Sequence, residues 1–250
     1  MPIQFIQRLT SAERSHRTNV QLGAYMAFVA GAVNAGGFLA IARYTSHMSG
    51  IISAIGDDLA LNDLISVIGG ITLLLSFLFG AATTAIIVNW GHRRQIHSEF
   101  ALPLLLEAVL LLIFGLVGAN LNTYLPLTVP AIALLLCFVM GLQNAIVTKA
   151  SRAEIRTTHM TGVITDMGIE LGKLFYWNRL SADSEKEFVK ANRDKLKTHV
   201  FIFTMFLTGG IIGAVSFKQV GYISVVPLSF SLFLIAGLQI FRDFRAIFRH

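Results

Sequence analysis

The sequence contains few charged residues. Asp, Glu, Lys and Arg make up 14% of its 250 residues, whereas a soluble domain carries roughly a quarter. Hydrophobic residues make up 54%, and the mean hydropathy is +0.67. Such a chain cannot cover a water-facing surface of ordinary size, and it is too apolar to be disordered. The sequence therefore predicts an integral membrane protein.

Cysteine and catalytic motifs are also scarce. Cys137 is the single cysteine, so no internal disulfide can form. The sequence lacks a Walker loop, a His-Glu-x-x-His zinc motif, a nucleophile elbow and a dinucleotide fingerprint. We therefore expect no enzyme and no cofactor. The basic residues form no clustered face with base-reading groups, so we expect no nucleic-acid partner.

Long apolar stretches dominate what is present. A helix needs about 20 apolar residues to cross the hydrocarbon core of a bilayer. The charge-free stretch 108–148 is interrupted by a polar segment ending at Pro126, so two helices meet there. The predicted spans are 20–42, 65–89, 100–119, 125–147, 199–217 and 221–240.

The distribution of Lys and Arg predicts the orientation. With six spans and a cytoplasmic N-terminus, 18 of the 20 Lys and Arg residues lie inside. We expect a bacterial inner-membrane protein with both termini cytoplasmic and its basic residues against anionic lipid headgroups. The loop 173–197 is expected to be cytoplasmic and helical, because Ser184 and Glu187 fit a capping box. After residue 240, Phe and Arg alternate at helical spacing, which is typical of a helix in the headgroup plane.

A segment containing His-Met occurs twice. Residues 45–60 and 157–172 are identical at seven of 16 aligned positions, including His47 with His159. Two further pairs of matching segments follow the same order: Gly31–Ala35 with Gly141–Ala145, and Phe77–Gly80 with Phe206–Gly209. Each copy contains three spans, and because three is odd, the second copy must be upside down. Inverted repeats of this kind recur in secondary transporters.

The predicted fold is therefore an all-α polytopic membrane protein, a single transmembrane domain over residues 1–250. It contains two inverted three-helix repeats, at about 20–119 and 125–241. Segments 45–60 and 157–172 are predicted to be short re-entrant or half-spanning helices. The alternative makes both segments full spans, which gives eight spans and parallel repeats, but it leaves only 13 basic residues inside against 7 outside.

The second copy reads Arg156-Thr-Thr-His-Met-Thr-Gly-Val-Ile-Thr-Asp-Met-Gly-Ile-Glu-Leu171, and Gly141-Leu-Gln-Asn-Ala145 precedes it. These motifs resemble the bacterial YoaK-type membrane proteins, the family of the domain of unknown function 1275. The resemblance covers nearly the whole chain. Ser49 and Ile51 of the first copy stand where the family usually has Thr and Asn. The resemblance implies a polytopic inner-membrane protein and no particular activity.

Polar residues of the repeats are candidates for a substrate or ion path. The N-terminus of a half-spanning helix offers free amide groups to a polar ligand, and ionisable groups at membrane depth are often functional. Thr45, Ser46 and Thr157 are candidate N-caps, as is Thr158. The predicted path residues are Asn34, His47, Glu107, Asn144, Thr158, His159, Thr161 and Asp166.

Two carboxylates have specific predicted roles. Asp166 has Ala54 as its counterpart and follows His159 by two helical turns on nearly the same face. We expect the pair to form a titrating centre, although a salt bridge from Asp166 to Arg156 or Lys173 is an alternative. Glu107 lies about 10 Å from the inner end of its span. It either serves the path or extends toward the cytoplasm.

The same residues also have purely structural interpretations. Gly50, Gly56, Gly162 and Gly168 would permit close helix packing, and Asn34 and Asn144 would bond between helices. His-Met pairs suit copper(I), but adjacent helical residues cannot both face one ion, so no metal is expected. The predicted function is a small-solute or ion transporter, with or without proton linkage, whose site lies between the two His-Met segments. The alternative is a structural or regulatory membrane protein, and a homo-oligomer is compatible with both.

Overall fold

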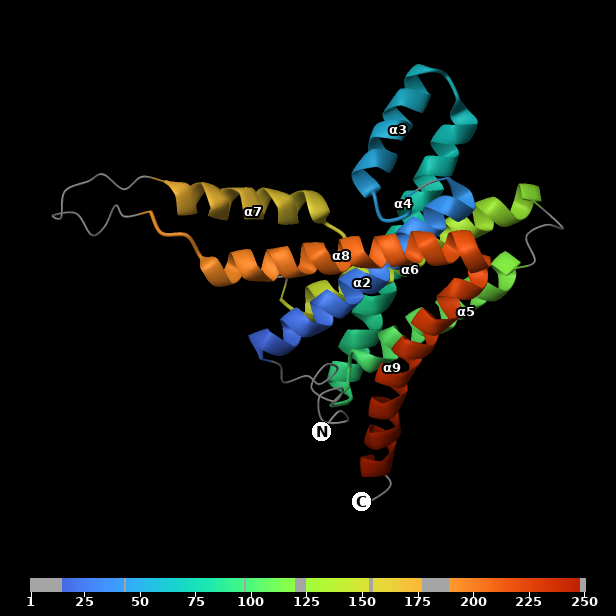
Figure 1. Cartoon of the computed structure of the whole chain (residues 1–250). Coiled ribbons are helices and arrows are strands. Elements are labelled where there is room, and N and C mark those ends of the chain that lie inside the picture. The colour runs from blue at the N-terminus through green and yellow to red at the C-terminus, as the bar shows by residue number, and fades with distance from the viewer. Residues whose placement is uncertain are drawn as a thin grey trace.

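The computed structural model describes residues 15–42, 44–96, 98–119, 125–152, 155–176 and 189–247, and every regular element in these ranges is a helix. The helices are α2 (His16–Ile41), α3 (Met48–Ala60), α4 (Leu64–Arg93), α5 (Ala101–Ala119), α6 (Leu125–Ala150), α7 (Met160–Phe175), α8 (Arg193–Val220), the 3-10 helix η3 (Gly221–Ser224) and α9 (Val225–Ile247) (Figure 1). The all-α prediction is confirmed for this part of the chain.

Each predicted span corresponds to one long helix. α2, α4, α5 and α6 are long and apolar enough to cross a bilayer, and so is the stretch Arg193–Phe241, which contains α8 and most of α9. Gly221, with a φ of 65°, separates these two helices. In contrast, α3 has 13 residues and α7 has 16, fewer than a span needs. The protein is a multi-pass helical membrane protein.

Polar side chains fix where several helices begin. Ser15 accepts a hydrogen bond from the Thr18 amide at the start of α2, and Asp63 accepts one from the Ser66 amide at the start of α4. Asn192 does the same for α8. These caps satisfy amide groups that have no partner within the first helical turn.

α4 and α6 pack in parallel through small residues. Gly80 lies against the carbonyl of Phe138, and one turn later Thr84 Oγ1 donates to the carbonyl of Leu142 at 2.9 Å. Both contacts join residues 58 apart, so the two helices run in the same direction. A side chain at position 80 would overlap the backbone of α6, so glycine sets the distance between the helices.

α2 and α8 pack in the same way. Gly31 lies against the carbonyl of Phe206, and Gly209 lies against the carbonyl of Phe28. Farther along both helices, Gly36 contacts the ring of Phe217, so α2 and α8 are also parallel. Gly141 of α6 meets Phe77 of α4 as Gly31 meets Phe206. Contacts at aligned positions of the two copies therefore match, and Gly209 and Gly213 both lie against the backbone of α2.

Other helix pairs run in opposite directions. Gln143 of α6 donates to the carbonyl of Met26 in α2, whereas the earlier residue Leu136 faces the later residue Gly37. α5 and α9 cross similarly, because Ser229 Oγ donates to the Ala108 carbonyl and Gly115 lies near Val225. α2 and α6 are thus antiparallel, as are α5 and α9. A core of buried apolar side chains fills the space between these helices: Leu22, Met26, Leu104, Phe114, Leu136 and Met140.

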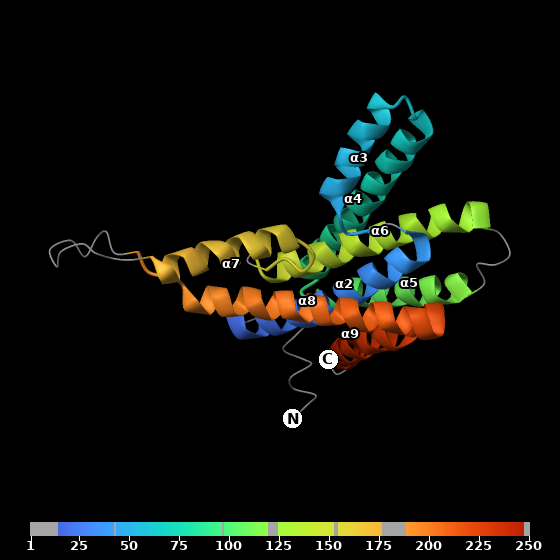
Figure 2. The ribbon, with the colours of Figure 1, turned by 45° about the horizontal axis from the view of Figure 1, so that its top comes forward.

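Two helical hairpins project from this bundle in different directions. α3 packs along the first half of α4, and α7 packs along the first half of α8 (Figures 1 and 2). Both carry exposed apolar side chains: Ile65 on α4 is 84% exposed, and Phe175 on α7 is 79% exposed. Such exposed faces suit contact with lipid.

Two local helix predictions need correction. α9 continues without a break from Val225 to Ile247, so the C-terminal segment is not a separate helix. The helical loop expected over 173–197 lies partly outside the described residues; within them, 173–175 end α7, residues 176 and 189–192 are not helical, and Arg193 begins α8.

Candidate functional site

The segment after each long helix folds back along that helix. Asn34 lies seven residues before the end of α2, and its Oδ1 accepts hydrogen bonds from the amide (3.3 Å) and hydroxyl (2.9 Å) of Ser46. Asn144 of α6 accepts a hydrogen bond from Thr158 Oγ1 in the same way, at 2.7 Å. At 1.5 Å per residue, α3 therefore begins about 10 Å back from the end of α2, and α7 begins about 10 Å back from the end of α6.

These hydrogen bonds correct the predicted capping. His47 and His159, not the preceding Ser and Thr residues, occupy the N-cap positions of α3 and α7, and neither makes a side-chain cap hydrogen bond. The Ser46 and Thr158 hydroxyls instead bond to the asparagines. The interhelical role proposed for Asn34 is also replaced, because its described partner lies in the connecting segment.

Each histidine ring lies over the glycine three residues later. A methyl group at Gly50 would stand 2.5 Å from Nδ1 of His47, and one at Gly162 would overlap His159 in the same way. Gly56 and Gly168 have open space around them, so no helix of the described chain packs against either. Four glycines were predicted to serve helix packing. Gly50 and Gly162 instead lie under a histidine ring, and a side chain at Gly56 or Gly168 would meet no atom of the described chain within 4 Å.

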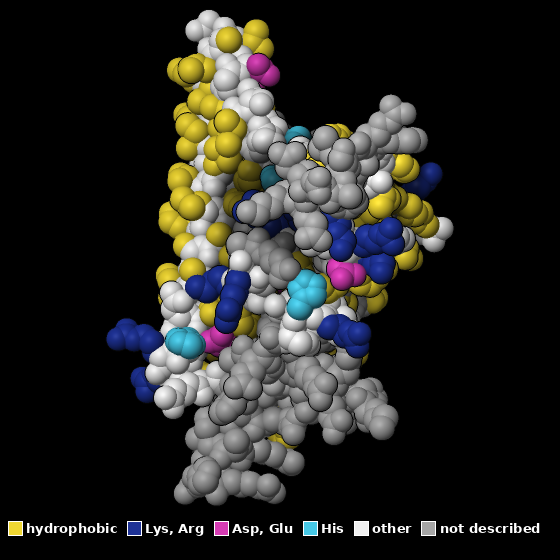
Figure 3. All heavy atoms as spheres, turned by 90° about the vertical axis from the view of Figure 1, so that its left-hand side faces the viewer, with side chains coloured by type: hydrophobic (Ala, Val, Ile, Leu, Met, Phe, Trp, Pro, Cys, Tyr) yellow, Lys and Arg dark blue, Asp and Glu magenta, His cyan; other side chains and the backbone are white. Residues whose placement is uncertain are grey.

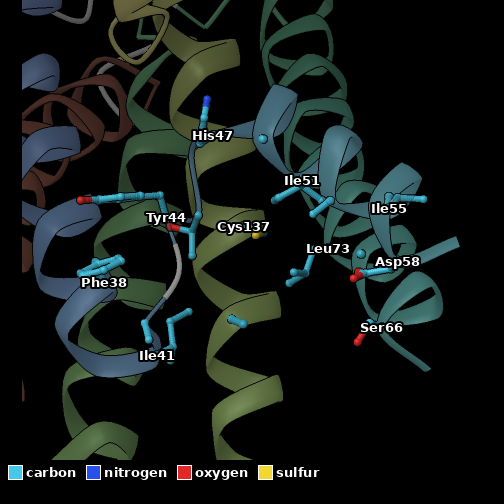
Figure 4. Close-up of a pocket in the computed structure, with 16 residues that line it drawn as sticks. Phe38, Ile41, Tyr44, His47, Ile51, Ile55, Asp58, Ser66, Leu73 and Cys137 are labelled. Carbon is cyan, nitrogen blue, oxygen red and sulfur yellow. The ribbon is translucent and has the colours of Figure 1, made fainter. Parts of the chain in front are cut away.

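One cavity in the repeated segments, here the α3 pocket, measures about 360 Å³ and lies between α3, α4, α6 and the end of α2. Figure 4 shows His47 toward one end, Asp58 and Ser66 at the other, and Ile51, Leu73 and Cys137 between them. Thr45 also lines it; its side chain is 2% exposed. Polar groups thus stand at the ends of a largely apolar cavity.

A cavity at the aligned position of the second copy, the α7 pocket, measures about 450 Å³, and most of the residues that line it are polar. Asp166 lies in it, with Oδ1 3.3 Å from Lys195 Nζ and Oδ2 3.3 Å from His199 Nε2. The salt bridge predicted with Arg156 or Lys173 is therefore wrong, because α8 supplies both partners. The other polar residues that line the α7 pocket are Arg156, His159, Thr161 and Thr165.

The contact between Asp166 and His199 requires a proton. His199 Nδ1 lies 2.7 Å from the carbonyl of Lys195, and a carbonyl only accepts, so Nδ1 donates. A neutral imidazole then presents a lone pair at Nε2, which a carboxylate repels. The contact is attractive only when Nε2, or the carboxyl itself, carries a hydrogen. The geometry therefore places His199 Nε2 against the Asp166 carboxylate while Nδ1 faces the backbone of α8.

The two pockets are separate. α3 packs on α4 and α7 packs on α8, and the two cavities have no lining residue in common. The structure brings His159, Thr161 and Asp166 together and leaves His47 in the other cavity. Asn34 and Asn144 anchor the pockets from behind without lining them. The expected single site between the two His-Met segments is thus replaced by two cavities at aligned positions.

Glu107 lies in neither pocket. Its side chain is fully buried in α5, and within the described chain neither carboxyl oxygen has a hydrogen-bond partner. Full burial excludes the alternative that it extends toward the cytoplasm. Nearby, Tyr25 of α2 is hydrogen-bonded to Ser231 of α9. Glu107 is therefore an ionisable group inside the bundle, apart from the repeated segments.

Glu170 ties the α7–α8 hairpin together. Its carboxylate accepts hydrogen bonds from Lys173 Nζ (2.9 Å) and from the amide of Asn192, the residue that caps α8. The Lys173 hydrogen bond, followed by that from Asn192, lowers the pKa of Glu170 below its usual value. The aligned residue in the first copy, Asp58, has no ion-pair partner among the described residues.

Sequence reasoning missed Lys195, His199 and Asp58 as pocket residues. A signal was present. If the alignment of Phe77–Gly80 with Phe206–Gly209 is extended upstream, Lys195 falls on Ser66 and His199 on Gly70. The alignment of the two copies, which gives Asp166 an alanine counterpart, thus places Lys195 and His199 in one copy alone.

Comparisons with known proteins give one family. Residues 22–238 match the family described as protein of unknown function (DUF1275). The chain is also similar to the UPF0700 transmembrane protein YoaK of Bacillus subtilis (strain 168). The two are 24% identical over 153 residues, 60% of this chain and 67% of that protein. No solved structure matches.

Proposed function

Since the chain belongs to the DUF1275 family of membrane proteins, as its motifs predicted, we propose that it transports a small solute or ion across the bacterial inner membrane. The observation that carries this proposal is the pair of cavities, each lined by the first turn of a short helix that begins back from the end of a long one. One cavity would face each side of the membrane, as alternating access requires.

Inverted repeats are the topology that we propose. With six spans, α2 and α8 run outward, α4 and α6 run inward, and α5 and α9 run in opposite directions, which agrees with every pairing above. Eight spans would make α2 parallel to α6 and α5 parallel to α9, contrary to those contacts. α3 and α7 are then re-entrant helices whose N-terminal ends lie within the membrane.

The charge distribution supports a cytoplasmic α7 pocket. Figure 3 shows the side of the molecule to which the α7–α8 hairpin points, and Lys and Arg side chains gather on this face. Hydrophobic side chains cover the α3–α4 hairpin, which projects at the top of the same view. Basic residues at the end of α4 and the end of α6 would lie on the same side as the start of α8. Both termini would then be cytoplasmic.

A proton-linked step would use the α7 pocket. Imidazole changes charge near neutral pH, and loss of the proton between Asp166 and His199 would turn an attraction into a repulsion. That change would loosen α7 from α8 at the inner mouth. His159 lines the same cavity and would complete the titrating centre with Asp166.

The test measures solute-dependent pH change inside proteoliposomes that contain a trapped pH-sensitive dye, across a panel of small cations, anions and neutral solutes. We expect His159→Ala, Asp166→Asn and His199→Gln each to abolish pH-dependent flux without loss of folded protein. Asp194→Asn is the matched control, because Asp194 is exposed on the same hairpin and meets only Lys197, at 3.8 Å.

Two results would contradict the proposal. If all three α7-pocket variants retain the pH-sensitive flux of the wild type, the proposed proton linkage is wrong. A wild-type protein that is no more active than empty liposomes for every solute would favour the alternative, a structural or regulatory membrane protein.

A further inference from the structure

The α3 pocket differs from the α7 pocket in its charge balance. Positions 58 and 61 align with 170 and 173. In the second copy these residues are the ion pair Glu170–Lys173, whereas in the first copy they are Asp58 and Leu61. The first copy thus retains the carboxylate and lacks the cation. Asp58 lines the cavity, so a cation supplied by a ligand could occupy the missing position.

No Lys or Arg opposes this charge from within the hairpin. Residues 44–92 contain Asp57, Asp58 and Asp63 and no Lys or Arg. Ser66 donates its hydroxyl to Asp63 at 2.7 Å, and this hydrogen bond lowers the pKa of Asp63. The field at this end of the pocket is therefore negative, which attracts cations.

A second, independent feature points to a ligand. Within the described chain, the hydroxyl of Thr45 lines the α3 pocket with no hydrogen-bond partner, and its side chain is 2% exposed. Burial of a hydroxyl without a hydrogen-bond partner destabilises the folded protein. A polar group on a ligand would satisfy it. Phe38 and Tyr44, stacked at 4.5 Å, line the cavity on the same side as Thr45.

From these features we propose that the α3 pocket binds a small organic cation with an apolar body. Its ammonium group lies beside Asp58, its body lies against Ile51, Leu73 and Cys137, and a hydroxyl at its other end reaches Thr45. The volume of about 360 Å³ is within the range of small-molecule sites. The inference rests on the proposed function only in naming this ligand as a substrate; the binding itself is independent of transport.

Three probes of similar shape test the charge. The full chain, in nanodiscs of phosphatidylcholine, is titrated calorimetrically with tyramine (cation), tyrosol (neutral) and 4-hydroxyphenylacetate (anion), and empty nanodiscs give the background. We expect saturable binding of tyramine and at least about tenfold weaker binding of the other two, because only tyramine pairs with a partly desolvated carboxylate. This comparison uses wild-type protein alone.

Variants locate the site. Asp58→Asn should weaken tyramine binding about tenfold or more, whereas Asp57→Asn should leave it unchanged, because Asp57 is exposed and does not line the pocket. Thr45→Val should abolish any preference for tyramine over phenethylamine, which lacks the hydroxyl. The melting temperature of each variant checks that it is folded.

The inference is overturned if tyrosol or 4-hydroxyphenylacetate binds as tightly as tyramine, if tyramine binds no better than to empty nanodiscs, or if folded Asp58→Asn binds like the wild type. Its failure and that of the proposed function are distinct. Tyramine binding without any solute flux would contradict transport alone. Solute flux without tyramine binding would contradict this site alone.

Discussion

At the scale of single residues, the two histidines are held by glycines. His47 and His159 are exposed N-cap residues, and each ring lies over a glycine in the first turn of its helix. The side chain is thus placed at the mouth of its pocket by close contact, without a hydrogen bond to the cap. The identity of the residue three positions later therefore decides where each imidazole lies.

Substituting these glycines should displace the rings. In Gly50→Ala and Gly162→Ala the new methyl group occupies the space of the imidazole, so we expect solute flux to fall while the melting temperature changes little, because the ring can rotate away. Gly56→Ala and Gly168→Ala are the matched controls. Nothing lies within 4 Å of either site, and alanine favours a helix over glycine by about 1 kcal/mol. Equal flux in all four variants would contradict a positioning role.

At the scale of helices, close contact between helix backbones determines the distances between the helices of the bundle. Gly80→Ala would place a methyl group on the carbonyl of Phe138, which belongs to the backbone and cannot rotate away. We expect a loss of about 1–3 kcal/mol, as for an overpacked interior, measured as a lower midpoint of unfolding. Gly69→Ala on the same helix has open space and should be neutral or slightly stabilising. A neutral Gly80→Ala would show that α4 and α6 tolerate separation.

The α7–α8 hairpin should lose stability in acid through Glu170. Its pKa is lowered in the folded protein, so its stabilising contribution is present above the ordinary value near 4.5 and is lost as the pH falls through the folded pKa. Glu170→Gln should lower the melting temperature at pH 7 and flatten its decrease toward acid pH. Asp58→Asn at the aligned position, without an ion-pair partner in the described chain, should do neither. Identical pH profiles of the melting temperature for Glu170→Gln and wild type would contradict a stabilising contact between α7 and α8 through Glu170.

The positions of the helices could be predicted from the sequence better than the contacts that their side chains make. Apolar length, with the polar break before Pro126, predicted the long helices α2, α4, α5, α6, α8 and α9, because crossing lipid demands about 20 apolar residues whatever the neighbours are. Pairing could not be located so directly: Ser46 resembles an N-cap from its neighbours in sequence, yet it bonds to Asn34, twelve residues earlier. Asp166 likewise pairs with Lys195 and His199, beyond the loop. Such choices depend on which helices meet, which local patterns do not encode.

At the scale of the whole molecule, the two hairpins are equivalent parts of an asymmetric pair. Their sequences align, and their long helices pack through matching glycine contacts. One hairpin encloses a largely apolar cavity with an unpaired carboxylate, whereas the other encloses ion pairs. The proposed topology places them on opposite sides of the membrane, so the outer and inner mouths of the protein would differ in charge and in response to pH.

The tips of the hairpins provide the test of that topology. Asn62 lies between α3 and α4, Lys190 lies just before α8, and both are exposed. In a variant whose native Cys137 is replaced by alanine, Asn62→Cys and Lys190→Cys should react with an impermeant thiol reagent from opposite sides of intact cells and inverted vesicles. Six spans with inverted repeats require this, whereas eight spans with parallel repeats place both tips in the cytoplasm. Labelling of both from one side would remove the inverted repeat, and with it the assignment of one pocket to each face.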